Sequence, residues 1–150
     1  MSSNGKVLVV DDNLARAQQL AGLSEAAGFD TEIITDVAKV RTILGSDSEP
    51  DVMLCEMDLS GVTWDETRET LAERNVQVPV ILFSDDGAAE RIVTALRLGA
   101  SDFFTRPVED EAAFKRSLER SIRQRKIRRE LDRSQRRLEA ANTELRGAVK

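Results

Sequence analysis

The sequence predicts an α/β protein with a doubly wound parallel sheet, followed by one long helix. Three observations lead to this prediction. Short apolar runs alternate with helical patterns over the first 110 residues, as in a parallel sheet with right-handed crossovers. The runs at 6–10, 51–55 and 80–83 are almost continuously apolar, which indicates strands covered on both faces. From about residue 110 there is no strand pattern, and no glycine occurs before Gly147.

Five strands and five helices alternate in the predicted order. Glycines at 28, 45 and 99 stand just past the ends of three helical patterns, where a left-handed residue commonly ends a helix. We expect the sheet to have the flavodoxin-like strand order 2-1-3-4-5. The predicted strands are 6–10, 30–34, 51–55, 78–84 and 102–105, and the predicted helices are 14–27, 37–44, 65–73, 88–98 and 110–147.

Polar side chains gather where the predicted strands end. In a sheet of this kind functional groups lie beyond the carboxyl ends of the strands. Asp11 and Asp12 follow the first strand, Glu56 follows the third, Ser84 ends the fourth, and Arg106 follows the fifth. The chain has no histidine, so any chemistry must depend on carboxylates, a hydroxyl and a cation. We expect no enzyme: a phosphatase of the haloacid dehalogenase type needs two aspartates separated by one residue, and here they are adjacent.

The segments that carry these side chains resemble the receiver domain of bacterial two-component response regulators. The resemblance covers about residues 5–122 and rests on VLVVDDN, PDVMLCE, VPVILFS and GASDFFTRP. It implies that an aspartate ending the third strand takes a phosphoryl group from a histidine kinase. It implies that Mg²⁺ on the acidic pair and a lysine after the fifth strand assist. It also implies a switch made by the hydroxyl of Ser84 and the aromatic ring of Phe103.

The chain departs from this pattern at two positions that face one pocket. Glu56 stands at the phosphoacceptor position, and Arg106 stands in place of the lysine. Glutamate carries its carboxylate about 1.5 Å further, and misplacement on this scale can slow a reaction about a hundredfold. We therefore expect a pseudo-receiver, in which Glu56 is phosphorylated poorly or not at all and pairs with the planar fork of Arg106. The pair would hold the domain near one signalling state.

Several alternatives remain open from the sequence. Glu56 is equally consistent with a degenerate position in a domain kept as a scaffold. A conventional receiver would use Glu56 or Asp58 as its phosphoacceptor. For the metal, the expected Mg²⁺ ligands are the hard oxygens of Asp11, Asp12, Glu56 and Asp58. We expect this site to be weak or vacant, because Arg106 neutralises part of its charge and because Asp12 or Asn13 can cap the first helix instead. The peptide before Pro107 is expected to be cis, as is common in the family.

The last part of the chain differs in charge and pattern from the rest. Residues 113–150 carry 13 basic and 5 acidic side chains, whereas residues 1–112 carry 9 basic and 22 acidic ones. Leucines recur every seven residues with small residues between them, which predicts a coiled-coil seam of Ile127, Leu131, Ser134, Leu138, Ala141 and Leu145. We therefore expect a receiver domain over 1–122 and a coiled-coil signalling helix over 123–150. This helix would form a parallel homodimer and lead to an output domain absent from this chain.

A basic run followed by leucines also resembles a basic leucine zipper, which predicts a DNA-binding regulator as an alternative. Acidic residues at 119, 130 and 132 interrupt the run, and it lacks the asparagine that such helices use on base edges, so nucleic acid is the less favoured partner. No apolar run is long enough to cross a bilayer, and the N-terminus lacks the pattern of a signal peptide. We expect a cytoplasmic protein without a membrane partner.

Overall fold

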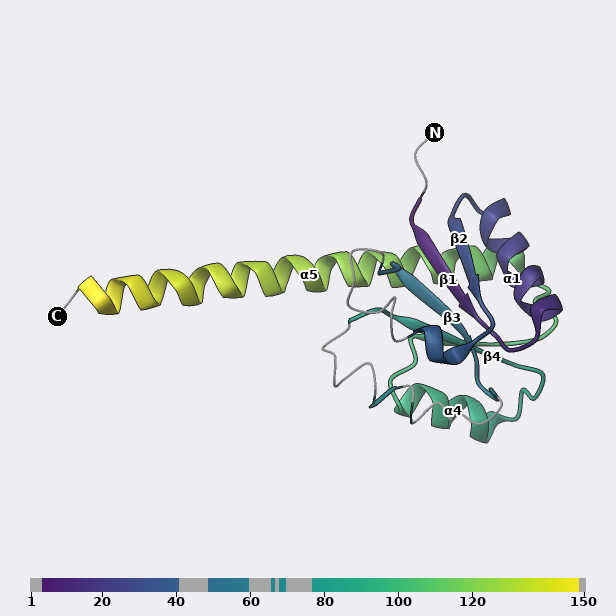
Figure 1. The fold of residues 1–150 in the computed structure, drawn as a ribbon. Helices are drawn as coiled ribbons and strands as arrows, with labels where there is room; N and C mark the ends of the chain where they lie inside the picture. Colours follow the sequence, from purple (N-terminus) through teal and green to yellow (C-terminus); the bar gives the residue numbers. More distant parts are fainter. Residues whose placement is uncertain (1–3, 41–48, 60–65, 67, 70–76, 149–150) are drawn as a thin grey trace.

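The computed structural model describes residues 4–40, 49–59, 66, 68–69 and 77–148 (Figure 1). Five parallel strands form one sheet in the order β2-β1-β3-β4-β5. The predicted fold class and strand order are therefore confirmed. The strands are β1 (Lys6–Val10), β2 (Asp30–Ile34), β3 (Val52–Glu56), β4 (Val80–Ser84) and β5 (Asp102–Thr105).

The boundaries of two strands, β3 and β4, differ from the prediction. Glu56 is the last residue of β3 rather than the first residue after it, because it pairs with Phe83 in the β3–β4 ladder. Asp51 precedes the strand, and its side chain accepts a hydrogen bond from the backbone N–H of Lys6 at 2.9 Å. β4 begins at Val80, because Pro79 has no N–H to donate to the ladder. Glu56 is thus fixed by the sheet itself.

Helices cover both faces of the sheet. They are α1 (Leu14–Ala26), the short 3₁₀ helix η1 (Val37–Lys39), α4 (Ala89–Arg97) and α5 (Glu111–Ala148). The side chain of Asn13 caps α1 by accepting a hydrogen bond from the N–H of Arg16 at 3.1 Å. Most of the helices predicted at 37–44 and 65–73 lies outside the described residues.

Alternate residues of the central strands supply two apolar clusters. Val7 and Val9 face α1 and α5 together with Ala17 and Leu118. Leu8 and Val10 of β1 face the other way and share a cluster with Ala95 of α4. Cys55 belongs to this second cluster, and its burial, followed by the charges of Glu56 and Asp11, raises the pKa of the thiol to about 12. The thiol is therefore neutral and packs as a small apolar side chain.

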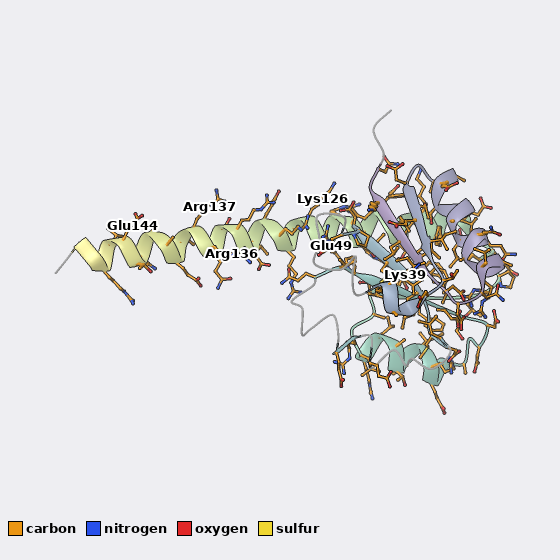
Figure 2. The ribbon with its side chains drawn as sticks, in the orientation of Figure 1. Lys39, Glu49, Lys126, Arg136, Arg137 and Glu144 are labelled. Carbon is orange, nitrogen blue, oxygen red and sulfur yellow. The ribbon has the colours of Figure 1, made fainter. Side chains whose placement is uncertain are left out.

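Helix α5 extends far beyond the sheet (Figure 1). Its 38 residues give a length of about 57 Å at ~1.5 Å per residue. Its last buried side chain is Arg125, and Ile127 is 52% exposed. Figure 2 shows Arg136, Arg137 and Glu144 on the part of α5 that lies away from the sheet. Among the helices that the structure describes, none is both long and apolar enough to cross a membrane.

Candidate functional site

The carboxyl ends of the central strands bring four of the predicted side chains to one edge of the sheet. Asp11 directly follows β1, Glu56 ends β3, Ser84 ends β4, and Arg106 follows β5 by one residue. Asp11, Glu56 and Ser84 are each buried, with exposed fractions of 1%, 3% and 1%. Burial of two carboxylates so close together requires nearby cations or hydrogen-bond donors.

Glu56 and Arg106 form an ion pair between Oε2 and Nη2; Glu56 is buried, and the side chain of Arg106 is 9% exposed. The other oxygen of Glu56, Oε1, accepts a hydrogen bond from the backbone N–H of Asp58 at 3.1 Å. Oε2 itself has no donor in hydrogen-bond geometry among the described residues, so the contact is mainly electrostatic. The guanidinium carbon of Arg106 lies 6.0 Å from the centroid of the Phe83 ring. The predicted cis peptide between Arg106 and Pro107 is confirmed.

Asp11 is the centre of the contacts at this edge. Its Oδ1 accepts hydrogen bonds from the N–H of Asn13 at 2.9 Å and from Nη2 of Arg16 at 2.8 Å. Its Oδ2 accepts from Nε of Arg16 at 3.1 Å and from Nη2 of Arg106 at 3.2 Å. Asp11 thus accepts four hydrogen bonds, and its bond with Arg16 is bidentate.

The sequence prediction missed Arg16. It lies in the first turn of α1, and besides Asp11 it contacts Asp12 through Nη2 at 3.3 Å. The hydrogen bond to Asp11 raises the pKa of the Arg16 guanidinium above its ordinary value, so the group stays charged. Asp12 and Arg16 are four residues apart, the spacing of neighbours on a helix surface. This spacing in the sequence is compatible with a pair between Asp12 and Arg16, but it gives no sign of the contact with Asp11.

A second, more exposed group surrounds Ser84. Its Oγ donates to Oδ2 of Asp58 at 3.3 Å and accepts from the N–H of Asp86 at 3.1 Å. Nη2 of Arg91, on α4, donates to the same oxygen of Asp58 and lies 3.4 Å from Oγ of Ser84. The hydrogen bond from Arg91 lowers the pKa of Asp58, and its charge and the Ser84 hydroxyl act in the same direction. The hydroxyl predicted as a switch is therefore tied to Asp58 and α4. Arg91 was not predicted.

The proposed magnesium ligands do not form a metal site in this arrangement. Within the described residues, no group of three or more acidic, cysteine or histidine side chains is placed to hold a metal ion. Asp11 and Asp12 face Arg16, Glu56 faces Arg106, and Asp58 faces Arg91. Guanidinium groups thus stand where a cation would have to bind. The residues present do not fit Mg²⁺.

The remaining predicted residues lie away from this edge. Phe103, in β5, is half-buried and packs against the apolar cluster on the α4 side of the sheet. On α5, Leu131, Leu138 and Leu145 are 65–67% exposed. Ser134 and Ala141, at the alternate positions of the predicted seam, are also exposed. The seam therefore contacts nothing within the described chain that would bury it.

Comparison with known proteins agrees with the fold. The profile of the response regulator receiver domain matches residues 7–129. The photosynthetic apparatus regulatory protein RegA of Rhodobacter capsulatus is 28% identical over 109 residues, which cover 73% of this chain and 59% of RegA. Full-length FixJ from B. japonicum has a TM-score of 0.74 at 23% identity, and the match covers 83% of this chain and 60% of FixJ. A fusion protein with a trimeric coiled-coil segment of yeast Spc42 has a TM-score of 0.73 at 18% identity, over 97% of this chain and 99% of the fusion. The chain thus spans about three fifths of the length of RegA and of FixJ.

Proposed function

Because the chain belongs to the response regulator receiver domain family, we propose that it is a signalling module whose Glu56–Arg106 ion pair replaces a phosphorylated aspartate and its lysine. In this proposal the module is not switched by phosphorylation of Glu56. The internal pair holds it near one signalling state. In this proposal, a histidine kinase that binds the module finds no phosphoryl acceptor at this position.

The observation that carries the proposal is the use of both oxygens of Glu56. Oε2 faces the guanidinium of Arg106, and Oε1 accepts the N–H of Asp58. A phosphoryl acceptor must present an oxygen to the incoming phosphorus, and a nearby cation must screen the charge of the phosphate. Here the cation is already bound to the acceptor. An attack by Glu56 would have to break a buried ion pair first.

The energy of such a pair is large enough to bias a domain. Two unit charges 4 Å apart interact by roughly 4 kcal/mol at an effective dielectric constant of 20, before desolvation is subtracted. Signalling states of a protein commonly differ by a few kcal/mol. A permanent pair between β3 and the residue after β5 can therefore do what a transient phosphoryl group does in other receivers.

The direct test is phosphorylation by a small phosphodonor. We expect no adduct when the full chain is incubated with acetyl phosphate and Mg²⁺ and its intact mass is measured. Asp58→Asn is the matched variant, because Asp58 is the more exposed carboxylate and the alternative acceptor. A stoichiometric, acid-labile adduct located on Glu56 would refute the proposal. An adduct that disappears in Asp58→Asn would instead establish a conventional receiver with a shifted acceptor.

We also propose that α5 pairs with a second copy of this chain through its leucine positions. Three leucines that recur every seven residues are each about two thirds exposed on one helix. Burying a leucine side chain fully contributes about 1.5–3 kcal/mol, which a lone helix in water does not gain. Serine and alanine at the alternate positions make the seam thin, so we expect a weak, concentration-dependent homodimer. An output domain beyond this segment would be consistent with relatives that are longer than this chain.

Sedimentation velocity over a concentration series tests the pairing. We expect the wild-type chain to associate as its concentration rises, and Leu138→Ser to shift the equilibrium to the monomer. Arg136→Ser, on another face of the same helix, is the control and should associate like the wild type. If both variants behave alike, the leucine seam does not carry assembly. Salt-sensitive binding to a short DNA duplex that Arg136→Ser weakens would instead favour the DNA-binding alternative.

A further inference from the structure

We propose that Arg16 occupies the place of the divalent cation, so that the acidic pocket excludes Mg²⁺ and the state of the domain does not depend on it. The inference rests on the contacts of Asp11 and holds whether or not Glu56 accepts a phosphoryl group. It assigns a role to a side chain of α1 that the Glu56–Arg106 pair does not use.

The first argument is that Asp11 has no acceptor position left. A carboxylate offers about four lone-pair sites on its two oxygens. Asn13, Arg106 and both Nε and Nη2 of Arg16 provide four donors to Asp11, at distances of 2.8–3.2 Å. A magnesium ion would need one of these lone pairs at a metal–oxygen distance of about 2.0–2.1 Å. It would therefore have to displace Arg16 or Arg106 from Asp11.

The second argument is charge. Asp11, Asp12, Glu56 and Asp85 supply four negative charges at this edge, and Arg16 and Arg106 supply two positive ones. The two guanidinium groups thus balance half of the negative charge without any metal. Arginine keeps its charge at any pH at which the protein is folded. A divalent ion beside two guanidinium groups would meet repulsion from both, in place of the three-carboxylate field that usually attracts it.

The third argument is that Arg16 is fixed in place. Its backbone N–H donates to the side chain of Asn13, and the N–H of Asn13 donates to Asp11. The start of α1 therefore holds both the donor and the acceptor of the bidentate pair. The side chain of Arg16 is only 27% exposed, and its Nη1 lies 3.9 Å from Oδ2 of Asp85 on the far side. Turning Arg16 out to solvent would break two hydrogen bonds to a buried carboxylate.

The test is a titration with Mn²⁺, the spectroscopic substitute for Mg²⁺, followed by electron paramagnetic resonance on the full chain. We expect the wild type to bind no more Mn²⁺ than the control variant Arg97→Ala, which removes an exposed arginine of α4. Arg16→Ala opens Asp11 and Asp12 to the metal, and we expect its affinity for Mn²⁺ to rise by at least about tenfold. Arg16→Lys keeps the charge without the fork and should still exclude the metal. Far-UV circular dichroism checks that each variant is folded.

The outcomes separate this inference from the proposed function. Mn²⁺ binding by the wild type with the affinity of Arg16→Ala would overturn it, as would a folded Arg16→Ala chain that gains nothing over Arg97→Ala. If Arg16→Ala does not fold, Arg16→Gln replaces it, with the same expected gain. A phosphoryl adduct on Glu56 would refute the proposed function but would leave the Mn²⁺ result unchanged. The phosphorylation experiment reports on Glu56, whereas the Mn²⁺ titration reports on Arg16.

Discussion

Two largely buried arginines, at opposite ends of the sheet, illustrate two ways to withdraw charge from solvent. At the carboxyl ends of the strands, Arg106 contacts Glu56 and Asp11. At the amino ends, Arg125 of α5 contacts Asp51 through Nη1 at 2.9 Å and Glu49 through Nη2 at 2.7 Å. The two side chains are 9% and 4% exposed, so both are withdrawn from solvent. Figure 2 shows Glu49 beside α5, at the base of the projecting part.

The difference between them lies in how well each guanidinium is satisfied. Arg125 uses both terminal nitrogens in separate charge-assisted hydrogen bonds, and among its nitrogens only Nε has no acceptor in the described chain. Arg106 leaves both Nε and Nη1 without a hydrogen-bond acceptor there, although Nη1 lies 3.6 Å from Oδ1 of Asp85, and Nη2 serves two carboxylates. Unsatisfied buried donors are costly. The amino-end contact, which holds α5 to the domain, is therefore the better satisfied of the two.

The largest expected effect is the loss of the amino-end contact. Arg125→Ala removes the charge-assisted hydrogen bonds to Asp51 and Glu49, of which Glu49 keeps Arg129 at 4.0 Å, and it removes the last buried side chain of α5. Breaking a buried pair costs about 3–5 kcal/mol, and partial exposure of Asp51 and Glu49 places the expected value near the lower end. Urea denaturation measures the loss of unfolding free energy.

The control for this prediction is Arg128→Ala, which truncates an exposed arginine on the same helix. Its effect should stay within about 0.5 kcal/mol. Equal losses in the two variants would mean that Arg125 does not fasten the helix, and that its contacts are ordinary surface pairs.

A smaller effect is expected at the carboxyl end. Glu56→Gln keeps the size of the side chain and the acceptor for the Asp58 N–H, but it removes the charge that faces Arg106. Two factors limit the loss. Arg106 keeps its hydrogen bond to Asp11, and the variant no longer has the desolvation cost of burying the Glu56 carboxylate. We therefore expect a loss of about 1–2 kcal/mol in the same urea experiment. A loss larger than that of Arg125→Ala would reverse the comparison and make the carboxyl-end contact the tighter fastening.

The same comparison shows what the sequence could predict. Alternating elements fix which strand ends share an edge, so Asp11, Glu56 and Arg106 could be brought together before any coordinates existed. The sequence indicates the burial of Arg125 only weakly. Arg125 continues the buried stripe of Leu118 and Ile122 by three residues, but it is one of 13 basic residues in the last 38. Its carboxylates lie more than 70 residues away in sequence. Periodicity places a side chain on a face and does not identify a distant partner.

Arg16 and Arg91 were missed for a related reason. Each is a charged residue in the first turns of a helix, where arginine usually lies in solvent. Their roles depend on the direction in which the helix start points over the strand ends, and that direction is set by packing of the whole layer. A bidentate contact to a buried carboxylate therefore cannot be predicted from residue type and spacing alone.

The smallest expected effect concerns a third pair, Arg91 with Asp58, which sharpens the comparison because it is exposed. The side chain of Asp58 is 58% exposed, so solvent screens the pair and we expect Asp58→Asn to cost less than about 1 kcal/mol at pH 7. Arg91 lowers the pKa of Asp58 in the folded protein. On acidification the unfolded chain therefore takes up this proton first.

The stabilisation from this pair is thus complete above the pKa of an unfolded aspartate, about 3.9, and is lost as the pH falls through the lower value of the folded state. We expect the difference in urea midpoint between wild type and Asp58→Asn to be constant from pH 7 to about pH 5 and to narrow towards pH 3. Arg91→Gln removes the other partner of the same pair. The difference in urea midpoint between wild type and Arg91→Gln should narrow over the same pH range. A difference that stays constant down to pH 3 would show that Asp58 acts through its hydrogen bond with Ser84 rather than through its charge.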